Sequence, residues 1–113
     1  MLGIGVNSRI YLYRGAADMR KGFDGLSGIV RNELSEDPMG GALFVFLNRS
    51  RDKVKVLYWD RDGYAIWAKR LERGCFSLPP EGGGEIGMSG LALLLDGVSV
   101  SVVKRSARWR KAA

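Results

Sequence analysis

Histidine is absent from this chain, and cysteine occurs once, at Cys75. Without histidine the chain lacks the most common general base and metal ligand, and every catalytic triad that depends on an imidazole is excluded. A single cysteine can form neither an internal disulfide nor a zinc site of paired cysteines, so we expect Cys75 to be a small buried side chain. One unpaired thiol is also typical of a reducing compartment, and we expect a cytoplasmic protein.

Long hydrophobic runs are missing as well. No apolar stretch approaches the roughly 20 residues that a membrane-spanning helix requires, and Met1–Val6 lacks the basic residues that begin a signal peptide. The 113 residues, 46% hydrophobic and 27% charged, suit one globular domain. We therefore expect a single domain over residues 1–103, a basic and flexible tail over 104–113, no membrane contact and no cofactor.

Positive charge is abundant and unevenly distributed. The net charge is +6, yet residues 49–73 alone hold eight basic and four acidic side chains, and the last ten residues hold five basic ones and no acid. Charge concentrated in this way is typical of proteins that bind the phosphate backbone of nucleic acids. The same residues could also solvate strand surfaces and a loose end, so charge alone leaves both interpretations open.

The middle of the chain has the pattern of a β-meander. Arg9–Arg14 alternates polar and apolar residues and is predicted as a strand. Ala42–Leu47 is a continuous apolar run, which predicts a strand buried on both faces. Lys53–Trp59 and Tyr64–Leu71 are two further strands, joined at Asp62-Gly63, a dipeptide that favours tight hairpins.

Helical spacing is found on either side of these strands. In residues 17–34 the apolar side chains recur at three- and four-residue steps, which predicts a helix with one buried face and with Asp18 near its start as a cap. Residues 88–95 predict a short second helix, and Val98–Val103 a last strand. The expected fold is α+β: a small antiparallel meander of three to five strands, packed against the helix at 17–34.

Metal and phosphate-loop motifs are weak. Asp60 and Asp62 lie close together and could hold Mg²⁺, but turn formation explains both residues more simply. Gly82-Gly83-Gly84 lacks the Lys-Ser/Thr that follows a phosphate-binding loop. We expect no metal site.

Four blocks of sequence together carry a resemblance. They are residues 18–26 (DMRKGFDGL), 41–46 (GALFVF), 55–63 (KVLYWD and a later glycine) and 69–76 (KRLERGCF). In this order and spacing the chain resembles the TnpB-type accessory protein of the "IS sixty-six" family of bacterial insertion sequences, which is unrelated to the RNA-guided nuclease of the same name. The resemblance runs from about Ile10 to Gly97. The chain departs from the family pattern after Phe76, where Ser77-Leu78-Pro79 replaces a tryptophan-proline pair. The signature residues are Asp18, Met19, Arg20, Lys21, Gly22, Gly25, Leu26, Tyr58, Trp59, Asp60, Gly63, Lys69, Arg70, Leu71, Glu72, Gly74 and Phe76.

The resemblance implies a role in transposition without assigning a catalytic residue. Elements of this kind encode a separate, larger transposase and small companion proteins, so the implied partners are the transposase and a companion of the same element. We expect an accessory protein that is not an enzyme. Its mode of action is left open between a module that contacts DNA and a module that docks on the other proteins without contacting DNA.

The candidate DNA contacts are the basic residues of the signature blocks and of the predicted first hairpin. We expect them to form one basic face, with like charges brought together by strand pairing. The candidates are Arg20, Lys21, Arg49, Arg51, Lys53, Lys55, Lys69, Arg70 and Arg73. Each also has a plainer interpretation as a solvated side chain. The aromatic residues among them (Tyr58, Trp59, Tyr64 and Trp67) are expected to belong to the core, with base stacking as the alternative.

Overall fold

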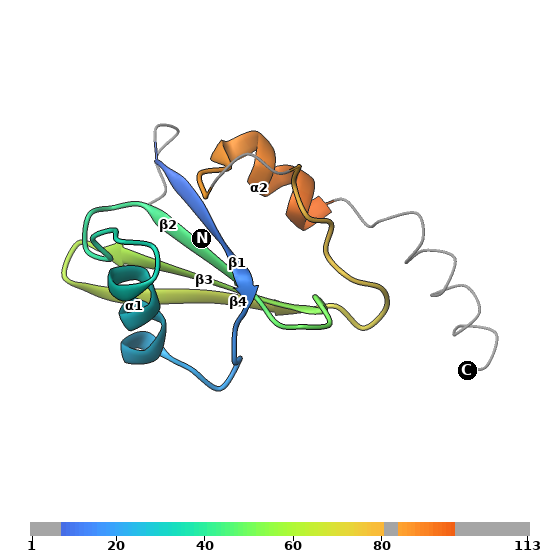
Figure 1. Cartoon of the computed structure of the whole chain (residues 1–113), viewed down its shortest axis with the longest axis horizontal. Coiled ribbons are helices and arrows are strands. Elements are labelled where there is room, and N and C mark those ends of the chain that lie inside the picture. The colour runs from blue at the N-terminus through green and yellow to red at the C-terminus, as the bar shows by residue number, and fades with distance from the viewer. Residues whose placement is uncertain (1–7, 81–83, 97–113) are drawn as a thin grey trace.

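Six helices and strands make up the computed structural model, which describes residues 8–80 and 84–96. In chain order they are β1 (Ile10–Ala16), α1 (Phe23–Asn32), β2 (Leu43–Leu47), β3 (Lys53–Asp60), β4 (Gly63–Arg70) and α2 (Gly87–Asp96) (Figure 1). This is the expected α+β architecture.

The four strands form one sheet in the order β1-β2-β3-β4. β2, β3 and β4 pair antiparallel, which confirms the meander predicted for residues 42–71. β1, however, pairs parallel to β2, so the expectation of a wholly antiparallel sheet is wrong. The physical reason is the helix between them: α1 carries the chain back to the end of the sheet at which β1 began, so β2 runs in the same direction as β1.

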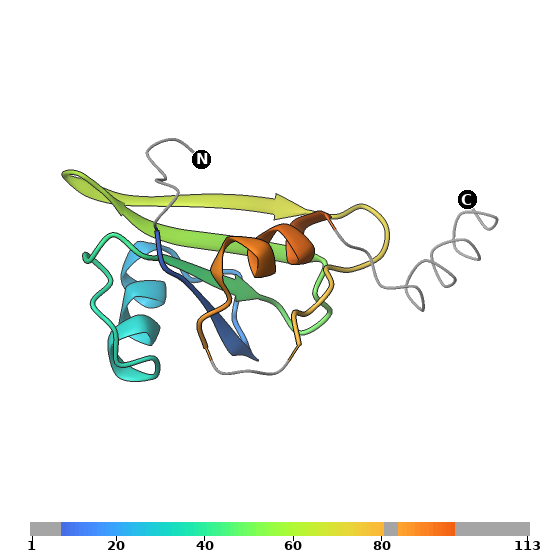
Figure 2. The ribbon, with the colours of Figure 1, turned by 90° about the horizontal axis from the view of Figure 1, so that it is seen from above.

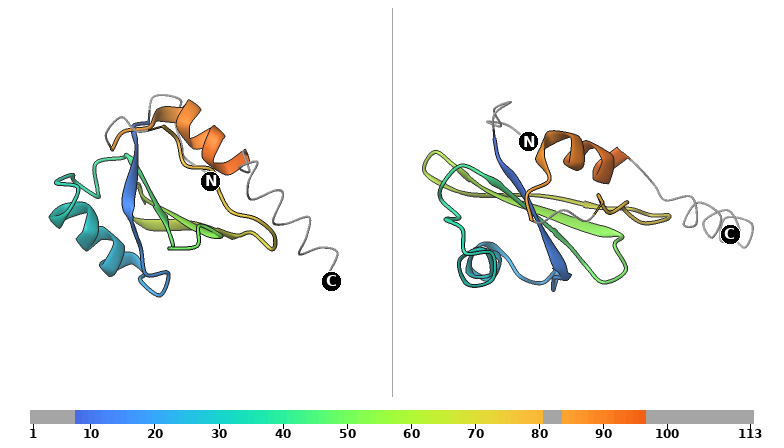
Figure 3. Two further views of the ribbon diagram at one scale, coloured as in Figure 1. Left: turned by 45° about the vertical axis from the view of Figure 1, so that its right-hand side comes forward. Right: turned by 45° about the horizontal axis from the view of Figure 1, so that its top comes forward.

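The two helices cover opposite faces of this sheet (Figures 2 and 3). Leu26 and Val30 of α1 pack with Phe44, Phe46 and Leu57 on one side, called here the α1 face. On the other side, the α2 face, alternate strand residues pack with the second helix; the buried members of this cluster are Ile10, Leu12, Leu43, Val45, Leu47, Val54, Val56, Phe76, Leu91 and Leu94. All five residues of β2 are buried, as its continuous apolar run predicts.

α1 is shorter than the helix expected over 17–34. It begins at Phe23 after Gly22, whose carbonyl accepts the amide of Leu26 at 2.9 Å. Residues 17–22 form a loop instead, and Asp18 closes a turn within it, so the prediction that Asp18 caps the helix is wrong. In a helix the carbonyls of Met19 and Lys21 would accept amides four residues on. Here a side chain from the sheet captures both carbonyls.

The β3–β4 turn has Arg61 and Asp62 at its centre, because Asp60 pairs with Gly63. Arg61 has a φ of 59°, and the amide of Asp62 donates to the carbonyl of Asp60 at 2.6 Å. The tight turn lies in the region that the sequence predicts, but one residue earlier than the Asp62-Gly63 dipeptide indicates, because the positive φ falls on Arg61 and on neither Asp62 nor Gly63.

The remaining elements agree with expectation or lie outside the described residues. α2 extends the predicted helix at 88–95 by one residue at each end. Cys75 is a free, buried thiol. The strand expected at Val98–Val103 and the basic tail at 104–113 fall outside the described part of the chain. Neither helix described is long and apolar enough to cross a membrane.

Candidate nucleic-acid interface

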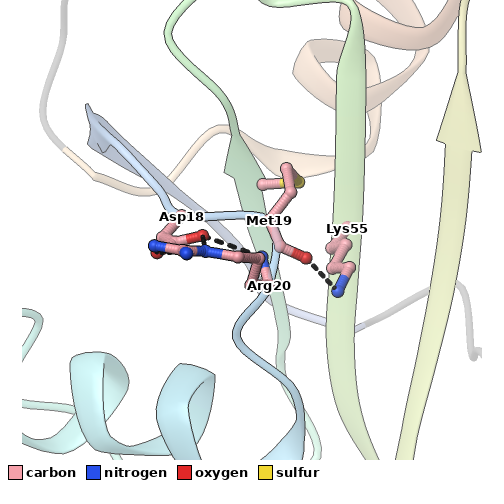
Figure 4. Close-up of polar contacts among 4 residues, drawn as sticks. All are labelled: Asp18, Met19, Arg20 and Lys55. Atoms are coloured by element: carbon pink, nitrogen blue, oxygen red, sulfur yellow. Dashed lines mark hydrogen bonds and ion pairs between the residues drawn. The ribbon is translucent and has the colours of Figure 1, made fainter.

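Lys55 holds the loop that precedes α1. Its ammonium group donates to the carbonyl oxygen of Met19 at 2.7 Å (Figure 4) and to that of Lys21 at 2.9 Å. A lysine ammonium has three donor positions and no acceptor, so one such group can bind two backbone carbonyls at the same time. Lys55 thus fixes the path of residues 19–21, which makes it a structural residue and a poor candidate for contacting phosphate.

Asp18 and Arg20 stiffen the same loop from its outer side. The Asp18 carboxylate accepts the Arg20 amide at 2.9 Å and the Arg20 guanidinium at 2.8 Å. These hydrogen bonds from Arg20 hold the pKa of Asp18 well below its usual value, and the same pair raises the pKa of Arg20. The Arg20 side chain is nevertheless 92% exposed, so most of its donors still face solvent.

A shallow cleft of about 490 Å³ separates this loop from the β2–β3 hairpin. We call it the basic cleft, because three of its lining side chains are the cations Arg20, Arg49 and Lys53. Asp18 is its single acidic lining residue, and that carboxylate is already engaged by Arg20. Arg49 and Lys53 form no ion pair with any carboxylate in residues 8–80 or 84–96. The cleft therefore combines exposed positive charge with little compensating negative charge.

Strand register places one further cation beside Lys53, outside the lining of the cleft, and turns another to the opposite face of the sheet. Lys53 lies directly opposite Arg70, and both share the α1 face with Lys55 and Leu57. Like charges placed opposite each other in a sheet repel, although Glu72 offsets part of this through its ion pair with Arg70 at 2.9 Å. Lys69 is opposite Val54 and so projects from the α2 face. The expectation that Lys53 and Lys55 lie beside both Lys69 and Arg70 is right for Arg70 and wrong for Lys69.

The two remaining candidate cations belong to the connections around the hairpin. Arg51 sits in the β2–β3 loop with a φ of 58°, and its carbonyl accepts the amide of Phe76 at 2.7 Å. Arg73 lies in the segment that leads from β4 back to this bond. The segment after β4 thereby supports the hairpin that carries Arg49 and Lys53.

The hairpin loop itself is built by three polar side chains that the sequence interpretation did not single out. Asn48 accepts the amide of Lys53 at 3.1 Å and donates to Asp52 at 2.7 Å, while Ser50 donates to Asp52 at 2.9 Å. The hydrogen bonds from Asn48 and then Ser50 hold the pKa of Asp52 below its usual value. Asn, Ser and Asp at alternate positions between two strands are the signal from which this loop could have been predicted.

The four aromatic residues do not form one stacking platform. Tyr58 and Trp67 pack on the α2 face, while Trp59 and Tyr64 contact each other on the α1 face with ring centroids 5.1 Å apart. All four are half-buried. The expected core assignment holds only in part, and the rings are divided between two faces.

Asp60 and Asp62 stand at the β3–β4 turn, at the far end of β3 and β4 from Lys53 and Arg70. Among residues 8–80 and 84–96 no group of three acidic, histidine or cysteine side chains is placed to hold a metal ion. What the described surface offers is therefore a cationic cleft on a fixed loop and hairpin.

Comparison with known proteins identifies the family. The family model described as IS66 Orf2-like protein matches residues 8–105. The chain belongs to the IS66 Orf2-like family. Two proteins of Sinorhizobium fredii are similar to it, both described as uncharacterized: y4hO, 41% identical over 100 residues and 87% of each chain, and y4jC, 36% identical over 107 residues, 93% of this chain and 92% of its own. No solved structure gives a significant match.

IS66 Orf2-like proteins are accessory proteins associated with the transposition of insertion sequences, so the resemblance seen in the sequence is confirmed. In this IS66 Orf2-like protein several signature residues have structural roles. Leu26 and Phe76 are fully buried, and Gly74 has a φ of 76°, a conformation that favours glycine. The Lys21 side chain passes so close to Gly25 that a β-carbon there would lie 2.9 Å from it. The first signature block thus describes the loop that Lys55 holds and the start of α1.

Proposed function

We propose that this transposition accessory protein is not an enzyme and binds DNA by its phosphate backbone, through the basic cleft and the cations beside it. The contact residues are Arg20, Lys21, Arg49, Lys53 and Arg70. Of the nine candidates considered from the sequence, Lys55 is assigned to holding the loop, Lys69 to the opposite face, and Arg51 and Arg73 to the connections around the hairpin.

The observation that carries this proposal is the placement of Arg49 and Lys53. Both are exposed, both line one cleft, and neither forms an ion pair with a carboxylate among the described residues. A phosphodiester would relieve the repulsion between Lys53 and Arg70 and would accept hydrogen bonds from the free guanidinium donors of Arg20 and Arg49. Contacts of this kind position a protein on DNA without reading its sequence.

The rigid mounting of the cleft supports the same assignment. One wall is the loop held by Lys55 and by the Asp18–Arg20 pair, and the other wall is the hairpin held by Asn48, Ser50 and Asp52. Cations on preorganised backbone lose less conformational freedom when an anion binds.

The test is DNA binding by fluorescence anisotropy over a series of salt concentrations. For wild type we expect the logarithm of affinity to fall linearly with the logarithm of salt, by about 0.9 for each phosphate neutralised. Arg49→Gln and Lys53→Gln should each weaken binding to all DNA sequences alike. Each should also reduce the salt slope by about 1, the amount that corresponds to one lost phosphate contact.

Lys69→Gln is the matched control, because it removes the same charge from the neighbouring strand on the opposite face. If Lys69→Gln weakens binding as much as Lys53→Gln does, the cleft is not the binding site. If wild type binds no DNA even at low salt, the DNA proposal fails.

A second candidate function is docking on the element's transposase or companion protein without DNA contact. It is favoured by the exposed apolar side chains on and near α2: Leu78, Met88 and Leu93 are each 45–47% exposed. Exposed apolar clusters mark protein contact sites in many soluble proteins. Co-purification of the transposase that persists after nuclease treatment and is lost in Met88→Ser/Leu93→Ser would support docking.

A further inference from the structure

Within the described residues, one margin of the sheet is covered and the other has no partner strand. On the outer side of β1, the amide of Leu12 donates to Gly84 at 2.7 Å and the amide of Ile86 donates to Ile10 at 2.8 Å. β4 forms the opposite margin (Figure 2), and no other segment of residues 8–80 or 84–96 pairs with its outer side. β4 is also long and regular, with eight consecutive pairs to β3 and no shift of register. Such an edge is a template for another strand.

The register identifies which backbone groups of β4 point outward. The amide of Leu71 donates to the carbonyl of Asp52 at 2.7 Å, which continues the β3–β4 ladder by one step. In an antiparallel ladder the backbone groups of successive residues point alternately toward the partner strand and away from it. Every second residue counted back from Leu71, that is each odd-numbered residue of β4, is therefore bonded to β3. The amides and carbonyls of Tyr64, Ile66, Ala68 and Arg70 therefore face outward.

The charges along this edge are polarised. β4 begins at a turn of two acids and one base, Asp60, Arg61 and Asp62, with a net charge of −1, and it ends at the two bases Lys69 and Arg70. A parallel neighbour with the same sequence would bring like charges together. An antiparallel neighbour with the same sequence would bring the basic end of one strand beside the acidic turn of the other, which makes the edge complementary to itself.

We propose that two copies of this chain associate by antiparallel pairing of their β4 strands. A two-fold axis through such a continuous sheet places directly opposite residues on the same face, so the strand must be centred on a residue that pairs with itself. If the two-fold axis passes beside Ile66, the outward amides and carbonyls of Tyr64, Ile66 and Ala68 all face partners on the second β4 strand. This register sets Tyr64 opposite the small side chain of Ala68 and Asp62 opposite Arg70, each twice by symmetry.

This register has a consequence for the basic clefts. Because the two-fold axis is perpendicular to the sheet, both α1 faces point to the same side of the dimer, and the two clefts lie on that side. The inference rests on the edge of β4 and not on DNA binding, so either proposal can fail without the other.

The test is the solution mass of the full chain, measured by light scattering after size exclusion and by sedimentation over a wide concentration series. We expect a concentration-dependent species of twice the 12.4 kDa monomer. Ala68→Pro removes an outward amide without removing a bond to β3, and should weaken dimerisation about tenfold or more. Ala68→Thr, which keeps the amide, is the matched control and should dimerise like wild type.

The register is tested by reversing charges. Asp62→Arg should weaken the dimer about tenfold, and Asp62→Arg combined with Arg70→Asp should restore it. Circular dichroism identifies any variant that fails to fold, and because Asp62 is exposed on the turn its variants test the edge even if Ala68→Pro does not fold. A wild type that stays monomeric at every concentration, or a folded Ala68→Pro that dimerises like wild type, overturns the proposal; failure of the double reversal to restore the dimer overturns the register.

Discussion

Lys53 and Lys55 lie on the same face of β3, yet the same substitution should change a different property of the protein at each position. Lys55 donates to two backbone carbonyls, whereas Lys53, two residues earlier, is exposed and lines the basic cleft. Methionine keeps most of the apolar stem of lysine and removes the charge. Lys55→Met should therefore cost stability, and Lys53→Met should cost DNA affinity.

The magnitude follows from the two hydrogen bonds. A hydrogen bond from a charged donor contributes about 1.5–3 kcal/mol. Because this site is only partly buried, water can replace part of each bond, and we expect about 2–3 kcal/mol for the pair. At roughly 4–8 °C per kcal/mol for a domain of this size, the Tm of Lys55→Met should fall by about 10–20 °C. Lys53→Met should stay within about 0.5 kcal/mol of wild type, since Lys53 forms no ion pair within residues 8–80 and 84–96 and lies opposite Arg70 in the sheet.

Urea unfolding with linear extrapolation measures the stabilities, and anisotropy under conditions where both variants are folded measures DNA binding. Lys55→Met should keep the salt slope of wild type, whereas the slope of Lys53→Met should be smaller by about 1, because one phosphate contact is lost. The reasoning is refuted if Lys55→Met is as stable as Lys53→Met, because the loop before α1 would then not depend on the lysine.

Three further predictions concern the loops and the turn. Asp52→Asn should lower the free energy of unfolding by about 1 kcal/mol at neutral pH. Because the pKa of Asp52 is lower in the folded state, the carboxylate stabilises the fold above its unfolded pKa, and this stabilisation is lost as pH falls through the folded pKa. The difference in unfolding free energy between variant and wild type, measured by urea titration, should therefore shrink below about pH 4. Asp60→Asn and Asp62→Asn should leave the DNA affinity measured by anisotropy unchanged, and Mg²⁺-dependent cleavage of labelled DNA by wild type that disappears in these variants would contradict a non-catalytic role. Gly74→Ala should destabilise the protein by about 1–2 kcal/mol, because φ is 76° at that position, whereas thermal unfolding equal to wild type would show that the loop can rearrange.

The meander was predictable because its signals are local. Alternation of side chains, a continuous apolar run and a turn dipeptide each act within a few residues, and all three strands formed where these signals place them. The direction of β1 was not predictable in this way. It depends on where a helix returns the chain, and the pattern of Arg9–Arg14 is the same for a parallel and an antiparallel neighbour.

The candidate site was predicted in composition and only partly in geometry. Charge density singled out residues 49–73, but it could not show that Lys53 and Lys69 lie on opposite faces of the sheet, because that depends on the register between β3 and β4. Nor could it distinguish Lys55 from Lys53. That distinction depends on two carbonyls more than 30 residues away, in a segment that the apolar spacing had assigned to a helix.

The parallel pairing of β1 with β2 also determines the order in which this chain can fold. β3 and β4 are joined through two residues, so their contacts close a short loop at low entropic cost, on the microsecond scale of isolated hairpins. Pairing of β1 with β2 has to close a loop of residues 17–42, which includes α1. Contacts so distant in sequence form slowly. During synthesis on the ribosome, the first strand of the sheet to emerge is therefore the last to find its partner, and slow steps in refolding should respond most to substitutions in Ile10–Ala16.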